Sequence, residues 1–195
     1  EARLAVVTPA HQSPLGVALS PARRRALLAW AREQGSWVVE DDYDSEFRYR
    51  GQPLAALKRQ DGDDRVIYAG SFSKMLFPGL RLGYLVVPAA LLARFEQGAR
   101  VLQQRSAQLL QLTAADFLEQ GHFTRHLKKM RQLYAQRRGY LVEALRLHCG
   151  AFLRVDEQAG GINLLARLVV DVPDWAVAEA AERAGLGVKA LSAWT

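Results

Sequence analysis

The chain has 195 residues, half of them apolar and 24% charged, which is the composition of a globular domain and excludes disordered, collagen-like and coiled-coil proteins. A single cysteine, Cys149, excludes an internal disulfide and favours a reducing, cytoplasmic location. No run of about 18 apolar residues is present, so the sequence predicts no membrane-spanning helix. The net charge of +6 does not by itself indicate nucleic-acid binding, because the basic residues are spread along the chain; Arg23 to Arg25 is interpreted as the solvated face of a helix.

The first part of the chain alternates short apolar strands with helices. Strands are predicted at residues 3–7, 36–40, 66–70 and 83–87. A helix is predicted to begin at Ser20 and Pro21, with the hydroxyl as cap, and to end at Gly35; a shorter helix is expected around residues 54–59. This alternation predicts an α/β fold with a mostly parallel sheet and flanking helices.

From residue 88 onward, helical spacing of apolar residues dominates. It predicts helices over residues 91–118 and 123–147, short strands at 152–155 and 162–168, and a helix from Pro173 to Gly185. We therefore divide the chain into part of an α/β domain (1–120), a long bridging helix (121–148) and part of a small α+β domain (149–195).

Chemically distinctive residues follow two of the predicted strands. An acidic and aromatic segment, residues 40–46, follows one strand, and Ser71-Phe72-Ser73-Lys74 follows the next, with Arg81 seven residues later. Ligands in open α/β sheets bind beyond the carboxyl ends of the strands, so we expect these groups to converge. Lysine, hydroxyl groups and arginine suit a phosphate, whereas a carboxylate suits a protonated ring nitrogen. Pyridoxal 5'-phosphate (PLP) requires all of these groups together.

Other motifs fit less well. Ser71-x-x-Lys74 also matches penicillin-binding proteins and β-lactamases, but their partner motifs, Ser-Asp-Asn and Lys-Thr-Gly, are absent. His122 and His126 have the spacing of a zinc motif without its glutamate, and we interpret them as a solvated helix face. No metal is therefore expected. There is also no Walker A motif and no dinucleotide fingerprint, so no dinucleotide is expected.

Four segments together resemble a known family. They are Thr8 to Gly16, Glu40 to Tyr49, Val66 to Lys74 and Pro78 to Tyr84. They are similar to the aminotransferase-like, fold-type I PLP domain of MocR-type regulators, a branch of the GntR family of transcription factors. The lysine and arginine segments are shared with fold-type I aminotransferases in general, whereas Asp-Asp-Tyr-Asp-Ser-Glu-Phe at 41–47 is far more specific to the regulators.

The resemblance implies a role for each matching residue. Lys74 forms the internal aldimine, Asp41 pairs with the pyridine nitrogen, and Tyr43 donates to the phenolic oxygen of the ring. Ser71, Ser73 and Arg81 bind the phosphate. Ser13 stands where aminotransferases have an asparagine that contacts the same ring oxygen, and Gln12 or His11 is an alternative donor for that contact.

The resemblance also predicts the context of the chain. We expect it to be a fragment that holds one side of the cofactor pocket, with an N-terminal winged helix-turn-helix, which alone would contact DNA, absent from it. The expected function is effector sensing, with PLP or an amino compound as effector, in a homodimer and without membrane association. The alternative is a working PLP-dependent aminotransferase, in which Lys74 also moves a proton at the substrate α-carbon.

Overall fold

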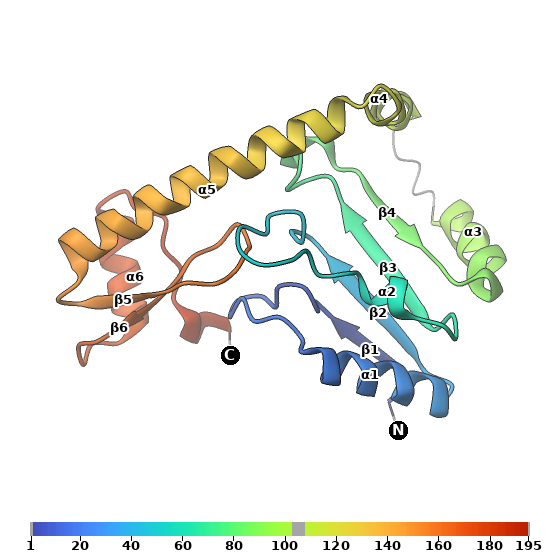
Figure 1. Cartoon of the computed structure of the whole chain (residues 1–195), viewed down its shortest axis with the longest axis horizontal. Coiled ribbons are helices and arrows are strands. Elements are labelled where there is room, and N and C mark those ends of the chain that lie inside the picture. Colours follow the sequence, from blue (N-terminus) through green and yellow to red (C-terminus); the bar gives the residue numbers. More distant parts are fainter. Residues whose placement is uncertain (1, 103–107, 195) are drawn as a thin grey trace.

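The computed structural model describes residues 2–102 and 108–194 and contains two sheets joined by a long helix (Figure 1). The first sheet has the order β1-β2-β3-β4, with strands Leu4–Val7, Trp37–Asp42, Val66–Ser71 and Gly83–Val86. β1, β2 and β3 are parallel, and β4 is antiparallel to β3. The predicted α/β fold with a mostly parallel sheet is confirmed.

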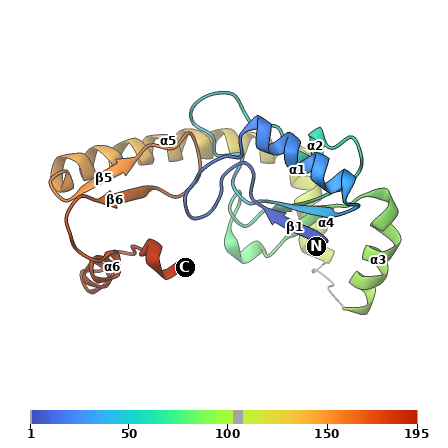
Figure 2. The same cartoon turned by 90° about the horizontal axis from the view of Figure 1, so that it is seen from below.

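Helices α1 (Pro21–Glu33) and α2 (Leu57–Gln60) lie over one face of this sheet (Figure 2). The predicted start of α1 is confirmed, because the Ser20 side chain accepts a hydrogen bond from the backbone N–H of Arg23. Gly35, at φ +60°, follows the helix and turns the chain into β2. The core between helices and sheet is formed by fully buried Ala31, Val38, Leu57 and Val66.

Arg24 corrects the interpretation of the basic cluster as a solvated helix face. Its side chain is buried, and it donates hydrogen bonds to three backbone carbonyls, those of Pro9, Leu19 and Ala55, at 2.7–3.1 Å. An arginine can be buried in this way because its forked donors satisfy several acceptors at once. Arg24 thereby fastens the loop after β1 to the segment before α2.

The second half of the chain is mainly helical. Its elements are α3 (Leu92–Val101), α4 (Gln108–Glu119), α5 (His122–Cys149), β5 (Leu153–Asp156), β6 (Leu165–Leu168) and α6 (Asp174–Arg183). The helix expected over 91–118 is present as α3 and α4, and its part at 103–107 lies outside the described residues. β5 and β6 pair antiparallel. Among the helices described, none is both long and apolar enough to cross a bilayer.

Helix α5 packs on the loops that follow β2 and β3 (Figure 1). Its Leu127 joins buried Phe47 and Met75 in a second core cluster, and the Phe123 ring meets Phe72 edge-on. His126 accordingly does not lie on a solvated face, since its Nε2 is 3.0 Å from the Met75 carbonyl oxygen. Within the described ranges, no group of three or more histidine, cysteine or acidic side chains is placed to hold a metal ion.

Candidate functional site

The register of β2 and β3 brings two predicted site residues to one face of the sheet. Asp41 lies beside Ala69. Side chains alternate along a strand, so Asp41, Ala69 and Ser71 share a face, while Glu40 and Asp42 project from the other. The carboxyl ends of these strands therefore present a carboxylate and a hydroxyl on the face opposite buried Glu40.

Two carboxylates of β2 have structural partners. Glu40 is 1% exposed and accepts hydrogen bonds from the backbone N–H groups of Leu57 and Lys58, at 2.7 and 2.8 Å. Asp42 accepts hydrogen bonds from Ser45 and from the Tyr68 hydroxyl, the latter at 2.9 Å. These contacts fix the start of α2 and the loop after β2.

Asp41 differs from these two residues because its side chain is exposed. Partial burial, and then the charge of neighbouring Asp42, raise the pKa of the Asp41 carboxyl. A cation placed against Asp41 would oppose both effects and favour its ionised form.

Lys74 lies in the loop after β3, and the residues on either side of it are held in place by a hydrogen bond and by burial. The Ser71 hydroxyl accepts a hydrogen bond from the backbone N–H of Ser73, at 3.2 Å, and the Leu76 N–H donates to the Phe72 carbonyl. Met75 is buried against α5, whereas Lys74 is exposed. No side chain in the described part of the molecule pairs with the Lys74 ammonium, which leaves it open to a ligand.

Arg81 is joined to this loop through the backbone. The Phe72 N–H donates to the Leu82 carbonyl at 3.0 Å, and Ser71 is paired with Gly83. Arg81 has a φ of +51°, a left-handed conformation that is unfavourable for residues other than glycine and is found preferentially at functional sites. Its side chain is exposed.

Tyr43 meets the loop that follows β1. Its hydroxyl donates to the His11 carbonyl oxygen at 2.8 Å and lies 3.1 Å from His11 Nδ1. Burial, and then the charge of Asp44, raise the pKa of Tyr43 to about 12, so the phenol remains protonated at neutral pH. Tyr43 is thus hydrogen-bonded to the loop that carries Ser13, while the Gln12 side chain is exposed.

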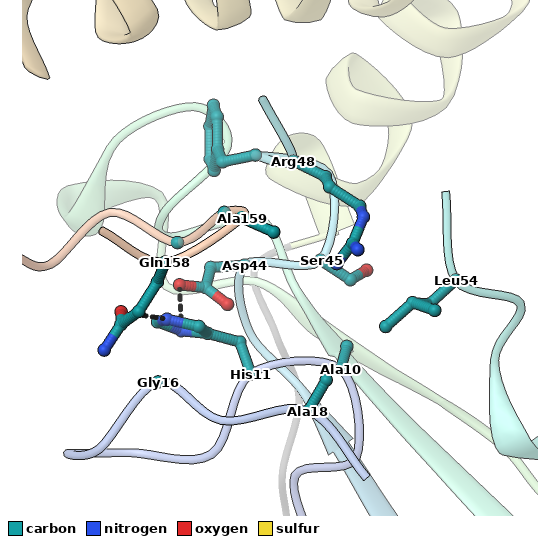
Figure 3. A pocket seen from close by; sticks show the side chains of 13 residues that line it. Ala10, His11, Gly16, Ala18, Asp44, Ser45, Arg48, Leu54, Gln158 and Ala159 are labelled. Carbon is teal, nitrogen blue, oxygen red and sulfur yellow. Dashed lines mark hydrogen bonds and ion pairs between the residues drawn. The ribbon is translucent and has the colours of Figure 1, made fainter. Parts of the chain in front are cut away.

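A buried polar cluster lies beside Tyr43 and lines a cavity of about 160 Å³ (Figure 3). His11 Nδ1 is 3.1 Å from the Asp44 carboxylate, and His11 Nε2 is 3.3 Å from Gln158 Oε1. Asp44 also accepts the backbone N–H of Ile162. Gln158 could not be identified from local sequence patterns, because its contact with His11 spans 147 positions.

The chemistry of these donors fits PLP. An unpaired amine, an exposed carboxylate, hydroxyl groups and an exposed guanidinium all lie on segments that β2 and β3 bring together. They correspond to the aldehyde, the basic ring nitrogen, the phenolic oxygen and the phosphate of that cofactor.

Comparisons with known proteins match the chain to bacterial transcriptional regulators. The probable rhizopine catabolism regulatory protein MocR of Rhizobium meliloti is 40% identical over 190 residues, which are 97% of this chain and 38% of that protein. The HTH-type transcriptional regulator YhdI of Bacillus subtilis is 38% identical over 189 residues, 97% of this chain and 40% of that protein. This chain therefore spans about 40% of the length of these relatives.

Solved structures show the same fold. Pyrococcus horikoshii kynurenine aminotransferase matches with a TM-score of 0.83 and 29% identity, over 96% of this chain and 46% of that one. The architecture is thus that of the fold-type I aminotransferases. The family model described as aminotransferase class I and II matches residues 1–168. The chain belongs to the aminotransferase class I and II family.

Proposed function

We propose that this chain is the PLP-binding, effector-sensing and dimerisation domain of a MocR-type transcriptional regulator. The observation that carries the proposal is its identity of 38–40% with HTH-type regulators over 97% of its length. In the intact protein, an N-terminal helix-turn-helix would contact DNA, and occupation of the PLP domain would shift its conformational equilibrium.

Each candidate residue takes a defined role in this proposal. Lys74 supplies the amine that links to the cofactor aldehyde, and Asp41 keeps the ring nitrogen protonated. Tyr43, with Ser13 and Gln12, faces the phenolic oxygen, while Ser71, Ser73 and Arg81 hold the phosphate. When bound, the cofactor supplies an electron sink and an imine that an amino compound can exchange.

Reductive trapping tests the binding site. The intact protein is loaded with PLP, treated with borohydride and digested, and the modified peptide is identified by mass spectrometry. We expect the label on Lys74, its loss in Lys74→Ala, and its retention in Lys128→Ala, which removes an exposed lysine of α5. Labelling of another lysine in the unmutated protein would overturn the assignment.

The second candidate function is a working aminotransferase, which is favoured by the match to kynurenine aminotransferase. Keto-acid release from PLP-loaded protein and an amino donor separates the two functions. A sensor is expected to stop within about one turnover, whereas sustained turnover would favour the enzyme. A change in operator binding when PLP or the amino compound is added would support the regulator.

A further inference from the structure

We propose that His11 is a positioning residue that acts through Tyr43: it is held as an imidazolium and turns the Tyr43 hydroxyl into a donor for the cofactor's phenolic oxygen. This inference rests on the proposed function and extends it to a residue outside the set of direct cofactor ligands. Six hydrogen-bonding or ion-pair contacts and the burial of the His11 and Asp44 side chains carry it.

The orientation of the Gln158 side chain determines whether Nε2, the first ring nitrogen of His11, carries a proton. Its side-chain amide N–H donates to the Leu15 carbonyl at 2.6 Å, so its oxygen is the atom that faces His11 Nε2. The Gln158 backbone carbonyl is in turn held by Arg138 of α5. An acceptor oxygen fixed in this place requires a proton on Nε2.

Asp44 determines whether Nδ1, the second ring nitrogen of His11, carries a proton. Asp44 is 2% exposed, and its carboxylate lies 3.1 Å from His11 Nδ1. Figure 3 shows this carboxylate facing the ring. A buried carboxylate favours a proton on the ring nitrogen that faces it. With Gln158 facing Nε2 and Asp44 facing Nδ1, both ring nitrogens of His11 face acceptors, and the ring is doubly protonated.

The charged surroundings agree with this protonation state. Burial by itself lowers the pKa of His11, but the hydrogen bond and charge of Asp44, together with Gln158, outweigh it; Arg138 opposes them, and the net direction is upward. Tyr43 is the remaining titratable group that contacts the ring, and it stays neutral.

The protonated His11 ring affects the hydrogen bonding of the Tyr43 hydroxyl. His11 Nδ1 is also 3.1 Å from the Tyr43 hydroxyl oxygen, and because this nitrogen carries a proton it cannot accept the phenolic one. The one acceptor that His11 offers is its backbone carbonyl, which is a weaker acceptor than a phenolate oxygen. The cationic ring polarises the Tyr43 O–H bond and strengthens its donation to a bound cofactor.

The pH titration of the cofactor's visible absorption tests this role in the PLP-loaded intact protein. A hydrogen bond to the phenolic oxygen weakens its attraction for the imine proton, so loss of that bond raises the pKa of the imine. We expect Tyr43→Phe to raise the titration midpoint, and His11→Gln to raise it by roughly 0.5–1 pH unit, a partial loss of one charge-assisted interaction. His148→Gln, which changes an exposed histidine, is the matched control and should leave the midpoint unchanged.

A double mutant separates positioning from a general structural effect. If His11 acts through Tyr43, then His11→Gln produces no further shift in the Tyr43→Phe background. An equal shift in both backgrounds, or no shift in either, would overturn the inference. Asp44→Asn provides a second variant, and it is expected to move the midpoint in the same direction as His11→Gln.

A readout without cofactor completes the test. In the intact apo-protein, the imidazole ¹⁵N chemical shifts of His11 should show two protonated nitrogens at neutral pH, and a single protonated nitrogen would overturn the inference. If the unmutated protein forms no PLP chromophore, the proposed function fails and this inference fails with it. A normal chromophore whose titration midpoint is unchanged in His11→Gln would overturn this inference and leave the proposed function intact.

Discussion

Five carboxylates lie between positions 40 and 46, and burial separates their roles. Glu40 and Asp42 satisfy backbone and hydroxyl donors on the α1 side of the sheet, and Asp44 pairs with His11. Asp41 is the exposed member of the strand, on the opposite face. A carboxylate that receives no hydrogen bond from the rest of the protein is the one best suited to meet a cationic ligand.

Gly161 is required where the segment before β6 approaches His11. Its φ is +88°, and a Cβ at this position would lie 2.1 Å from the buried imidazole ring. Gly161→Ala should therefore destabilise the protein by about 3 kcal/mol or more, from backbone strain and overpacking together. Chemical denaturation of the intact protein measures this loss.

Gly35→Ala is the matched control, because Gly35 also has a positive φ and its Cβ would meet nothing within 4 Å. We expect it to cost about 1 kcal/mol from strain alone. Equal losses in the two variants would show that Gly161 is not confined by His11.

His11 also makes stability depend on pH. Its pKa in the folded protein is raised above the ordinary value of 6.5, so its protonated form stabilises the fold. This contribution is complete below the unfolded-state pKa and is lost as the pH rises through the folded-state pKa. The free-energy difference between the unmutated protein and His11→Gln should thus be larger at about pH 6 than at about pH 9. A constant difference across this range would contradict the charged pair.

The sequence could predict the side chains whose chemistry and spacing are typical of a PLP site. Lys74, Asp41 and Ser71 follow predicted strands, and the pairing of β2 with β3 places their segments together. The resemblance implied that Tyr43 and Ser13 contact one ring oxygen, and the structure hydrogen-bonds Tyr43 to His11 in the loop that carries Ser13. The cofactor roles of all these residues stay predictions.

The partners of His11 and Arg24 could not be predicted in this way. Each is buried by contacts with distant segments, which local periodicity does not report.

Helix α5 supports the loops that carry the candidate site. Leu127 packs with Phe47 from the loop after β2 and with Met75, the neighbour of Lys74. Leu127→Ala should cost about 3 kcal/mol of unfolding free energy, as expected for a buried leucine. It should also weaken PLP binding, because the Lys74 loop loses part of its support.

The same helix provides the control. Leu147 is 78% exposed near the end of α5, and Leu147→Ala should change stability by less than about 0.5 kcal/mol. Denaturation and PLP titration of both variants measure the two effects, and similar results for Leu127→Ala and Leu147→Ala would refute the supporting role of α5.

The elements themselves were largely predictable, with errors at their boundaries. The apolar period predicted α5 at 123–147 against the observed His122–Cys149. β2 extends two residues beyond its predicted end, to Asp42. The extension was missed because acidic residues disfavour strands in isolation, whereas here Asp41 and Asp42 are paired with β3.

One face of the first sheet is incompletely covered at strand β1. On edge strand β1, Val7 packs toward the α1 core, whereas Leu4 and Val6 point the opposite way and are 51% and 67% exposed. Parallel sheets are normally covered on both faces, and an exposed apolar edge strand promotes association.

Val6→Lys should therefore have opposite effects in two forms of the protein. In the isolated 195-residue chain, we expect self-association, seen by light scattering, and a reduction of it by Val6→Lys, because the charge disfavours edge-to-edge pairing. In the proposed full-length regulator, where we expect further chain to cover this face, the same change should destabilise the fold by about 2 kcal/mol or more, because it places an unpaired charge in an apolar contact. Gln60→Lys, at an exposed polar position on α2, should do neither. A monomeric isolated chain, or an intact protein that tolerates Val6→Lys, would show that this face remains solvent-exposed.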